Sequence, residues 1–158
     1  MPVRAAAMLV LFSGLACGPA AATGTINCLI ADKNLTLTFE GIYSQGLGEG
    51  LARVRGEAQP NLKGLSPGFG PFALAQAHVT QFWLEGGALK LRRYRESESV
   101  PREALELVME TRQEGRDPNS YSGTYRGIIR HFETLTGPEG RETAFGGRVD
   151  CQTDRTRI

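Results

Sequence analysis

Leu35-Thr36-Leu37-Thr38-Phe39-Glu40 is the stretch of this 158-residue chain that decides its fold, because apolar and polar side chains alternate along it without interruption. An extended chain sends successive side chains to opposite faces, so this alternation produces one apolar face and one polar face. That pattern is typical of a β-strand with one buried side. Because the same period of two returns along most of the chain, the sequence predicts an all-β protein.

Other segments repeat this alternation and are separated by glycine-rich turns, which is typical of strands that follow one another in a meander. We expect further strands at residues 26–30, 51–58, 79–84, 88–95, 121–135 and 143–151. Such a series of short strands predicts a small antiparallel up-and-down β-barrel, with a two-sheet β-sandwich as the alternative.

Residues 101–114 fit two kinds of secondary structure. Pro101 suits the first turn of a helix, and Gly115 could end one. Leu105 and Leu107, however, also alternate with more polar neighbours. We expect a strand here, with one short helix as the alternative, because the segments on both sides are hairpin-like.

Residues 1–22 predict a cleavable signal peptide. Arg4 supplies a positive charge, residues 5–15 are almost wholly apolar, and Ala20-Ala21-Ala22 offers the small side chains of a cleavage site. The apolar stretch is too short to span a membrane, which takes about 20 residues. We therefore expect one β-barrel domain at residues 23–158, located in the periplasm or secreted.

The cysteines predict a disulfide that joins the two ends of the mature chain. Cleavage removes Cys17, and we do not expect a lipid anchor there because Leu15 lies one place too close to it. The two cysteines that remain, Cys28 and Cys151, form an even pair in an oxidising compartment. Their bond would place the first and last strands side by side, and a meander with neighbouring ends is a closed barrel.

Charge and composition limit the partners that this protein can have. The chain has 18 basic and 17 acidic residues, and removal of Arg4 with the leader leaves a mature domain with a net charge of about zero. A neutral domain argues against nucleic-acid binding. No second apolar stretch reaches membrane-spanning length. His78 and His131 are too few for a metal site when both cysteines are oxidised, and we expect no cofactor.

One string resembles a catalytic motif but lacks its chemistry. Gly64-Leu65-Ser66-Pro67-Gly68 matches the G-x-S-x-G pattern of serine hydrolases. In that motif the residue after the serine donates its backbone N–H to the oxyanion hole, and Pro67 has no N–H. We therefore expect a non-enzymatic binding or accessory protein. The alternatives are a hydrolase that uses carboxylates and an envelope assembly factor.

Residues 59–77 give the clearest indication of a binding region. This long segment contains three prolines and three glycines, which exclude helix and strand, and several large apolar side chains. We expect it to lie at the barrel mouth and to contact an unknown protein or small molecule. The sequence leaves the oligomeric state open. The candidate binding residues are Phe69, Phe72, Trp83, Arg92, Tyr94 and Tyr125.

The basic run Lys90-Leu-Arg92-Arg93-Tyr94-Arg95 has two faces if it forms a strand. Lys90, Arg92 and Tyr94 would point to one side. Arg93 and Arg95 would point to the other side, in phase with Leu89 and Leu91.

Overall fold

A single antiparallel sheet forms the framework of the protein. The computed structural model describes residues 22–45, 50–97, 102–132 and 140–155, and within these ranges it contains nine strands and no α-helix. The all-β prediction is confirmed. The strands are β1 (Ala22–Ala31), β2 (Leu35–Gln45), β3 (Gly50–Pro60), β4 (Phe72–Ala73), β5 (Val79–Glu85), β6 (Ala88–Glu96), β7 (Arg102–Gln113), β8 (Ser120–Phe132) and β9 (Glu142–Arg155).

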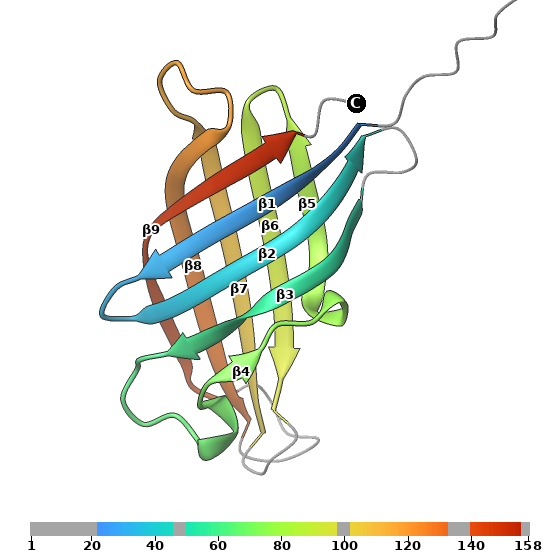
Figure 1. The fold of residues 1–158 in the computed structure, drawn as a ribbon. Helices are drawn as coiled ribbons and strands as arrows, with labels where there is room; N and C mark the ends of the chain where they lie inside the picture. The colour runs from blue at the N-terminus through green and yellow to red at the C-terminus, as the bar shows by residue number, and fades with distance from the viewer. Residues whose placement is uncertain (1–21, 46–49, 98–101, 133–139, 156–158) are drawn as a thin grey trace, which may run out of the picture.

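The sheet curls over itself into a half-barrel. Its strand order is β4-β3-β2-β1-β9-β8-β7-β6-β5, so β1 and β9 are neighbours at its centre, as the cysteines predicted. Figure 1 shows β1, β2 and β3 crossing over β5 to β8, which makes two facing layers. Among the described residues no ladder joins the two edges, β4 and β5. The neighbouring ends therefore do not close the barrel, and a seam remains between the edges.

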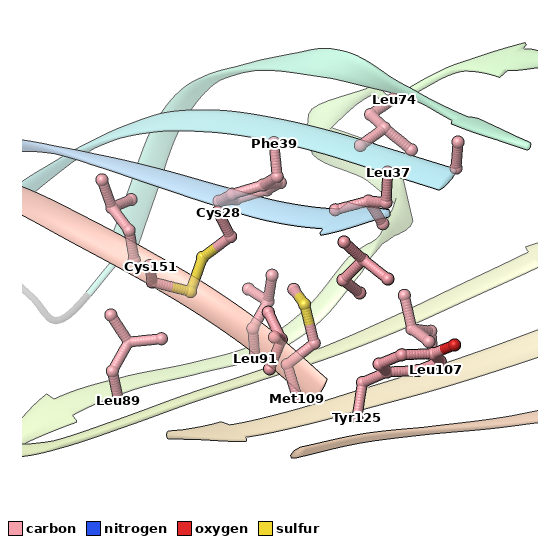
Figure 2. Close-up of a cluster of buried hydrophobic side chains, with 14 of the residues drawn as sticks. Cys28, Leu37, Phe39, Leu74, Leu89, Leu91, Leu107, Met109, Tyr125 and Cys151 are labelled. Carbon is pink, nitrogen blue, oxygen red and sulfur yellow. A yellow bond between two sulfur atoms is a disulfide. The ribbon is translucent and has the colours of Figure 1, made fainter. Parts of the chain in front are cut away.

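The core fills the space between the two layers. Alternation sends every second side chain of each strand inward, and in β2 Leu35, Leu37 and Phe39 are at most 2% exposed. They pack against Leu89, Leu91, Leu107 and Met109 of the opposite layer (Figure 2). Burying each of these side chains contributes about 2 kcal/mol to folding.

Within the segment 101–114, residues Arg102–Gln113 form the strand that the alternation favoured, so the helical alternative for this segment is wrong. β7 pairs with β6 on one side and with β8 on the other along most of its length. Two neighbouring ladders satisfy its backbone groups, and tertiary pairing therefore decides a segment whose local signals conflict.

The segment 61–78 closes one end of the half-barrel and covers the edge of β3. It contains two short 3₁₀ turns, η1 (Pro67–Phe69) and η2 (Gln76–His78). Phe69 is buried against Leu105 and Ile129, and Leu74 joins the main core. The Leu74 N–H donates to the Gly56 carbonyl at 2.9 Å, and the Gln76 side chain donates to the Leu51 carbonyl at 2.6 Å. The segment thus satisfies backbone groups that β3 would otherwise expose.

The predicted signal peptide lies outside the described residues, apart from Ala22, where β1 begins. Within the described part of the chain, no helix has the length and apolar character needed to cross a membrane.

Cys28 and Cys151 are bonded and lie directly opposite each other in the β1–β9 ladder. Both are buried, and their bond spans a sequence separation of 123 residues (Figure 2). In the chain-entropy model a disulfide that closes so long a loop stabilises the folded state by restricting the unfolded chain.

We expect the double variant Cys28→Ala/Cys151→Ala to lose about 4 kcal/mol of unfolding free energy, because the open unfolded chain gains conformational freedom. Urea unfolding followed by circular dichroism measures this loss. The single variant Leu29→Ala, at an exposed position of the same strand, serves as the control and should change stability little. A double variant as stable as the wild type would contradict a stabilising role for the bond.

Candidate functional site

The six residues predicted to bind a ligand occupy three different places. Trp83, Arg92 and Tyr94 lie on the outer face of β5 and β6. Phe69 and Phe72 belong to the 61–78 segment, and their ring centroids are 6.4 Å apart. Tyr125 is buried in the core near the β1–β2 turn. The structure therefore brings Phe69 close to Phe72 and Trp83 close to Arg92, and the binding roles of all six residues stay predictions.

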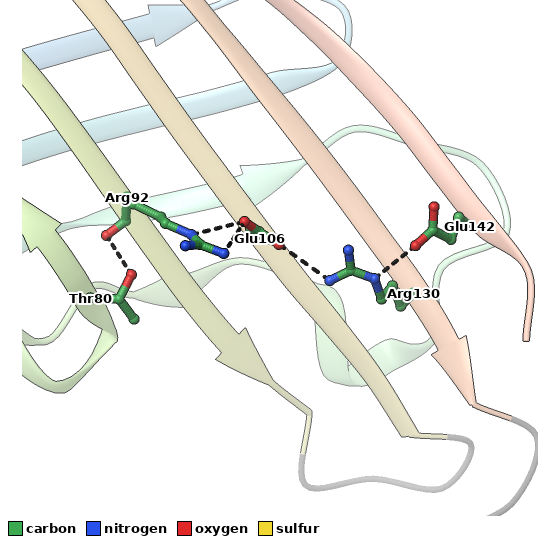
Figure 3. Close-up of polar contacts among 5 residues, drawn as sticks. All are labelled: Thr80, Arg92, Glu106, Arg130 and Glu142. Atoms are coloured by element: carbon green, nitrogen blue, oxygen red, sulfur yellow. Dashed lines mark hydrogen bonds and ion pairs between the residues drawn. The ribbon is translucent and has the colours of Figure 1, made fainter. Parts of the chain in front are cut away.

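On the outer face, Arg92 belongs to a chain of ion pairs that crosses four strands (Figure 3). Its guanidinium contacts Glu106 at 2.6 Å, and Glu106 also contacts Arg130 at 3.2 Å. Arg130 in turn contacts Glu142 at 2.7 Å. The charge of Arg92 is thus already balanced by a carboxylate. Exposed pairs of this kind contribute about 0–1 kcal/mol each.

On the outer face, the Trp83 side chain is exposed, whereas the Tyr94 hydroxyl is hydrogen-bonded. Trp83 is 48% exposed, an unusually large apolar surface for this protein. The Tyr94 hydroxyl donates to Glu96 at 2.6 Å. Burial, together with this bond to Glu96, raises the pKa of Tyr94 to about 12. Tyr94 is therefore a neutral donor that is already engaged.

Tyr125 holds the β1–β2 turn against the sheet. Its hydroxyl donates to both carboxylate oxygens of Asp32, at 2.8 and 2.9 Å. The backbone N–H groups of Asn34 and Leu35 donate to the same carboxylate. Burial alone would raise the pKa of Asp32, but these hydrogen bonds outweigh it and hold that pKa below its ordinary value.

A second polar group, the Glu103 cluster, consists of Glu103, Ser66, His131 and Ser97. Glu103 is 1% exposed, and its carboxylate accepts the Ser66 hydroxyl at 2.5 Å and the Ser66 N–H at 3.2 Å. His131 Nδ1 lies 2.8 Å from the same carboxylate. The backbone N–H of Glu103 donates to Ser97 Oγ at 2.9 Å. The cluster anchors the 61–78 segment to β7 and β8.

The Glu103 cluster has the residue types of a catalytic triad in the wrong order. In a triad the histidine lies between the serine and the carboxylate, so that it can accept the serine proton. Here Glu103 lies between Ser66 and His131, and the serine donates directly to the carboxylate. This order, with Pro67 next to the serine, gives the cluster an anchoring geometry rather than a nucleophilic one.

Arg93 is the most unusual charged residue of the interior. It is 4% exposed, and its Nε, Nη1 and Nη2 atoms have no hydrogen-bond partner among the described residues. Its guanidinium carbon lies 5.6 Å from the centroid of the Phe39 ring. Burial lowers the pKa of Arg93 to about 10, so the side chain remains charged at neutral pH. A buried charge without a hydrogen-bonding partner is costly in a folded protein.

Arg93 faces a partly open pocket between the two layers, beside β4 and η2, which we call the Arg93 pocket. Its free volume of about 20 Å³ is enough for one water molecule. Its other lining residues are mostly apolar and include no carboxylate: Leu35, Leu37, Ala58, Phe72, Leu74, His78, Tyr94, Arg95, Leu105 and Leu107.

Two further basic side chains border the Arg93 pocket. The guanidinium of Arg95 lies 3.9 Å from the centroid of the Phe72 ring, a cation–π contact. Burial lowers the pKa of His78, and the charges of Arg93 and Arg95 lower it further. Both neighbouring guanidinium groups therefore disfavour the protonated form of His78.

The alternation along residues 88–95 indicated that Arg93 faces inward, but Arg93 was not among the six predicted binding residues. Arg93 and Arg95 fall in phase with Leu89 and Leu91, and all four face inward in the structure. Arg92, which was the predicted binding residue, faces outward. No signal in the sequence pointed to the Glu103 cluster, because Ser66, Glu103 and His131 come together only through folding.

We expect Glu103→Gln to destabilise the protein by about 2 kcal/mol, because the amide cannot accept from all of its present donors and leaves buried groups unsatisfied. Hydrogen exchange should rise most in the 61–78 segment. The matched control is Glu110→Gln, which lies on the same strand as Glu103 and loses an exposed ion pair with Lys90 of β6. This variant should lower the free energy of unfolding by less than about 1 kcal/mol. Equal effects of the two variants would contradict the anchoring role.

We expect Asp32→Asn to change how the free energy of unfolding depends on pH in the acidic range. The folded pKa of Asp32 lies below the ordinary value of 3.8, so its contribution is present above pH 3.8 and disappears as the pH falls through the lower folded value. The stability difference between wild type and variant should therefore be largest near neutral pH and shrink below pH 3.8. Urea unfolding over a pH series measures it, with exposed Asp150→Asn as the control. A difference independent of pH would refute this.

Comparison with known proteins adds no family to this description. No known family model, curated protein or solved structure matches the chain. What the chain does must therefore be inferred from its own side chains, and the Arg93 pocket and the Glu103 cluster are the two arrangements that ordinary core packing does not explain.

Proposed function

We propose that this chain is an exported, non-enzymatic binding protein that takes its ligand at the mouth of the half-barrel. The contact site lies at the seam between the edges β4 and β5, where the 61–78 segment packs beside β6. The observation that carries this proposal is Arg93, whose buried charge faces a pocket and has no hydrogen-bond partner among the described residues. Buried charges are normally paired, so an incoming group is the natural counterpart of this one.

The chemistry around the seam favours binding over catalysis. The walls of the Arg93 pocket are mostly apolar, with five leucines, Ala58 and Phe72, which suits holding a ligand. The Glu103 cluster, which has the residue types of a hydrolase, has the order of an anchor. A carboxylate-based hydrolase remains the alternative, although no contact described above favours it.

Export is supported by the disulfide and by the leader that the sequence predicts. Disulfides persist in oxidising compartments such as the periplasm and the extracellular space. The Cys28–Cys151 bond lies in the core and joins the central strands, so a compartment in which it persists suits this fold. We therefore place the protein in the periplasm or outside the cell.

A thermal-shift screen of small acids, bases and neutral compounds tests this function. A ligand that binds only the folded state stabilises it by RT ln(1 + [L]/Kd), so Tm rises with ligand concentration. We expect at least one class to stabilise the wild type, and Ala58→Leu to abolish the effect because the larger side chain fills the Arg93 pocket. Circular dichroism verifies that this variant folds.

Trp83→Ala is the matched control because it removes the exposed aromatic side chain of the outer face and leaves the pocket intact. It should keep the response to the ligand. Loss of the response in Trp83→Ala but not in Ala58→Leu would move the site to the outer face and refute the proposal. A protein that no compound stabilises would also count against it.

A further inference from the structure

We propose that the Arg93 pocket binds the carboxylate of a small monocarboxylic acid with an apolar body. This inference rests on the proposed binding function and names the chemical class of the ligand. Arg93 would hold the acid group, and the leucines and phenylalanines around it would contact the rest of the molecule.

The first argument is the geometry of the free donors. The Nε, Nη1 and Nη2 atoms of Arg93 are buried and all lack hydrogen-bond partners within the described part of the chain, so no hydrogen bond of the protein occupies the planar fork. A guanidinium presents parallel N–H groups that match the two oxygens of a carboxylate. On one side the Phe39 ring contacts the cation without using any of these donors. An acid group could therefore bind without displacing an existing hydrogen bond.

The second argument is the sign of the charge in the pocket. The Arg93 guanidinium borders it, and no aspartate or glutamate is among its lining residues. The carboxylates nearest along β6 and β7 point elsewhere: Glu106 pairs with Arg92 on the outer face, and Glu103 binds Ser66. A positive, largely apolar pocket favours an anion and disfavours a cation or a strongly hydrated neutral molecule.

The third argument is the size and the wall of the pocket. About 20 Å³ of free volume is the space of about one water molecule, so a carboxylate enters only if the wall moves, and a phosphate with its larger shell of oxygens would need a larger movement. The apolar body must then lie at the rim, where Phe72 is half-buried. Phe72 belongs to β4, which pairs with β3 through only two residues, so it can shift with little loss of hydrogen bonding.

The experiment compares hexanoate with hexan-1-ol, which share a six-carbon chain and differ in the head group. Sodium chloride supplies chloride as a simple anion for comparison. Binding is measured by isothermal titration and by the NMR signals of the arginine Nε–Hε groups. The variants are Arg93→Met, which keeps an unbranched side chain but removes the charge, and Arg92→Met, the matched control on the outer face of the same strand. Arg93→Lys provides a second variant that keeps the charge but loses the fork.

We expect the wild type to bind hexanoate at least tenfold more tightly than hexan-1-ol and to show a shift of the Arg93 Nε–Hε signal. Arg93→Met should bind the acid and the alcohol alike, Arg93→Lys should fall between, and Arg92→Met should match the wild type. Without ligand, Arg93→Met should have a higher Tm than the wild type, because it removes a buried unpartnered charge.

Different results overturn different statements. Equal affinity of the wild type for the acid and the alcohol, unchanged in Arg93→Met, overturns the carboxylate assignment and leaves the binding function standing. Chloride that competes with hexanoate at equal concentration shows a site for any small anion and also overturns the assignment. A wild type that binds neither compound at millimolar concentration, and that no compound in the thermal screen stabilises, overturns both proposals.

Discussion

The antiparallel pairing of β1 with β9, fixed by the Cys28–Cys151 bond, determines where this molecule can be open. Because this pairing puts both ends of the described chain at the centre of the sheet, the two edges must come from its middle. Those edges are β4 and β5, which follow each other along the chain. The segment that connects them therefore lies at the seam and covers it. The Arg93 pocket is a consequence of this arrangement, since it forms where the cover meets the two layers.

Adjacent arginines of β6 show how one strand separates two kinds of charge. Arg92 faces solvent and pairs with Glu106. This ion pair costs little desolvation energy and contributes little to folding stability. Arg93 faces the core, where losing its hydration is expensive and no described residue repays the loss with a hydrogen bond. Ordinary folding would favour an apolar side chain at this position, as at Leu89 and Leu91. The presence of an arginine there is therefore better explained by a group that enters the pocket than by the stability of the empty protein.

Much of the fold could be predicted from the sequence, because strand formation depends on a local period. The alternation in residues 35–40 and its repeats located the long strands to within a few residues, and the cysteines predicted the pairing of the first with the last. The position of the seam could not be predicted, since it depends on which strands pair over long distances. The two-residue strand β4 is too short for a period to be visible. The phase of Arg93 was visible, but phase alone does not reveal that its donors are unpartnered.

The 61–78 segment combines a fixed part and an adjustable part, and this division suits a binding site. Ser66 is held by the buried carboxylate of Glu103, and Phe69 fills the space against Leu105 and Ile129. Beyond Phe69, the segment touches the edge of the sheet through the short pairing of β4 and a few single hydrogen bonds. Movement of Phe72 would therefore leave the Ser66–Glu103 anchor unchanged, and it would alter the contacts of Phe72 with the core and with Arg95. The sheet thus fixes the position of the Arg93 cation, while the wall at Phe72 pairs with β3 through only two residues and has few backbone hydrogen bonds to lose.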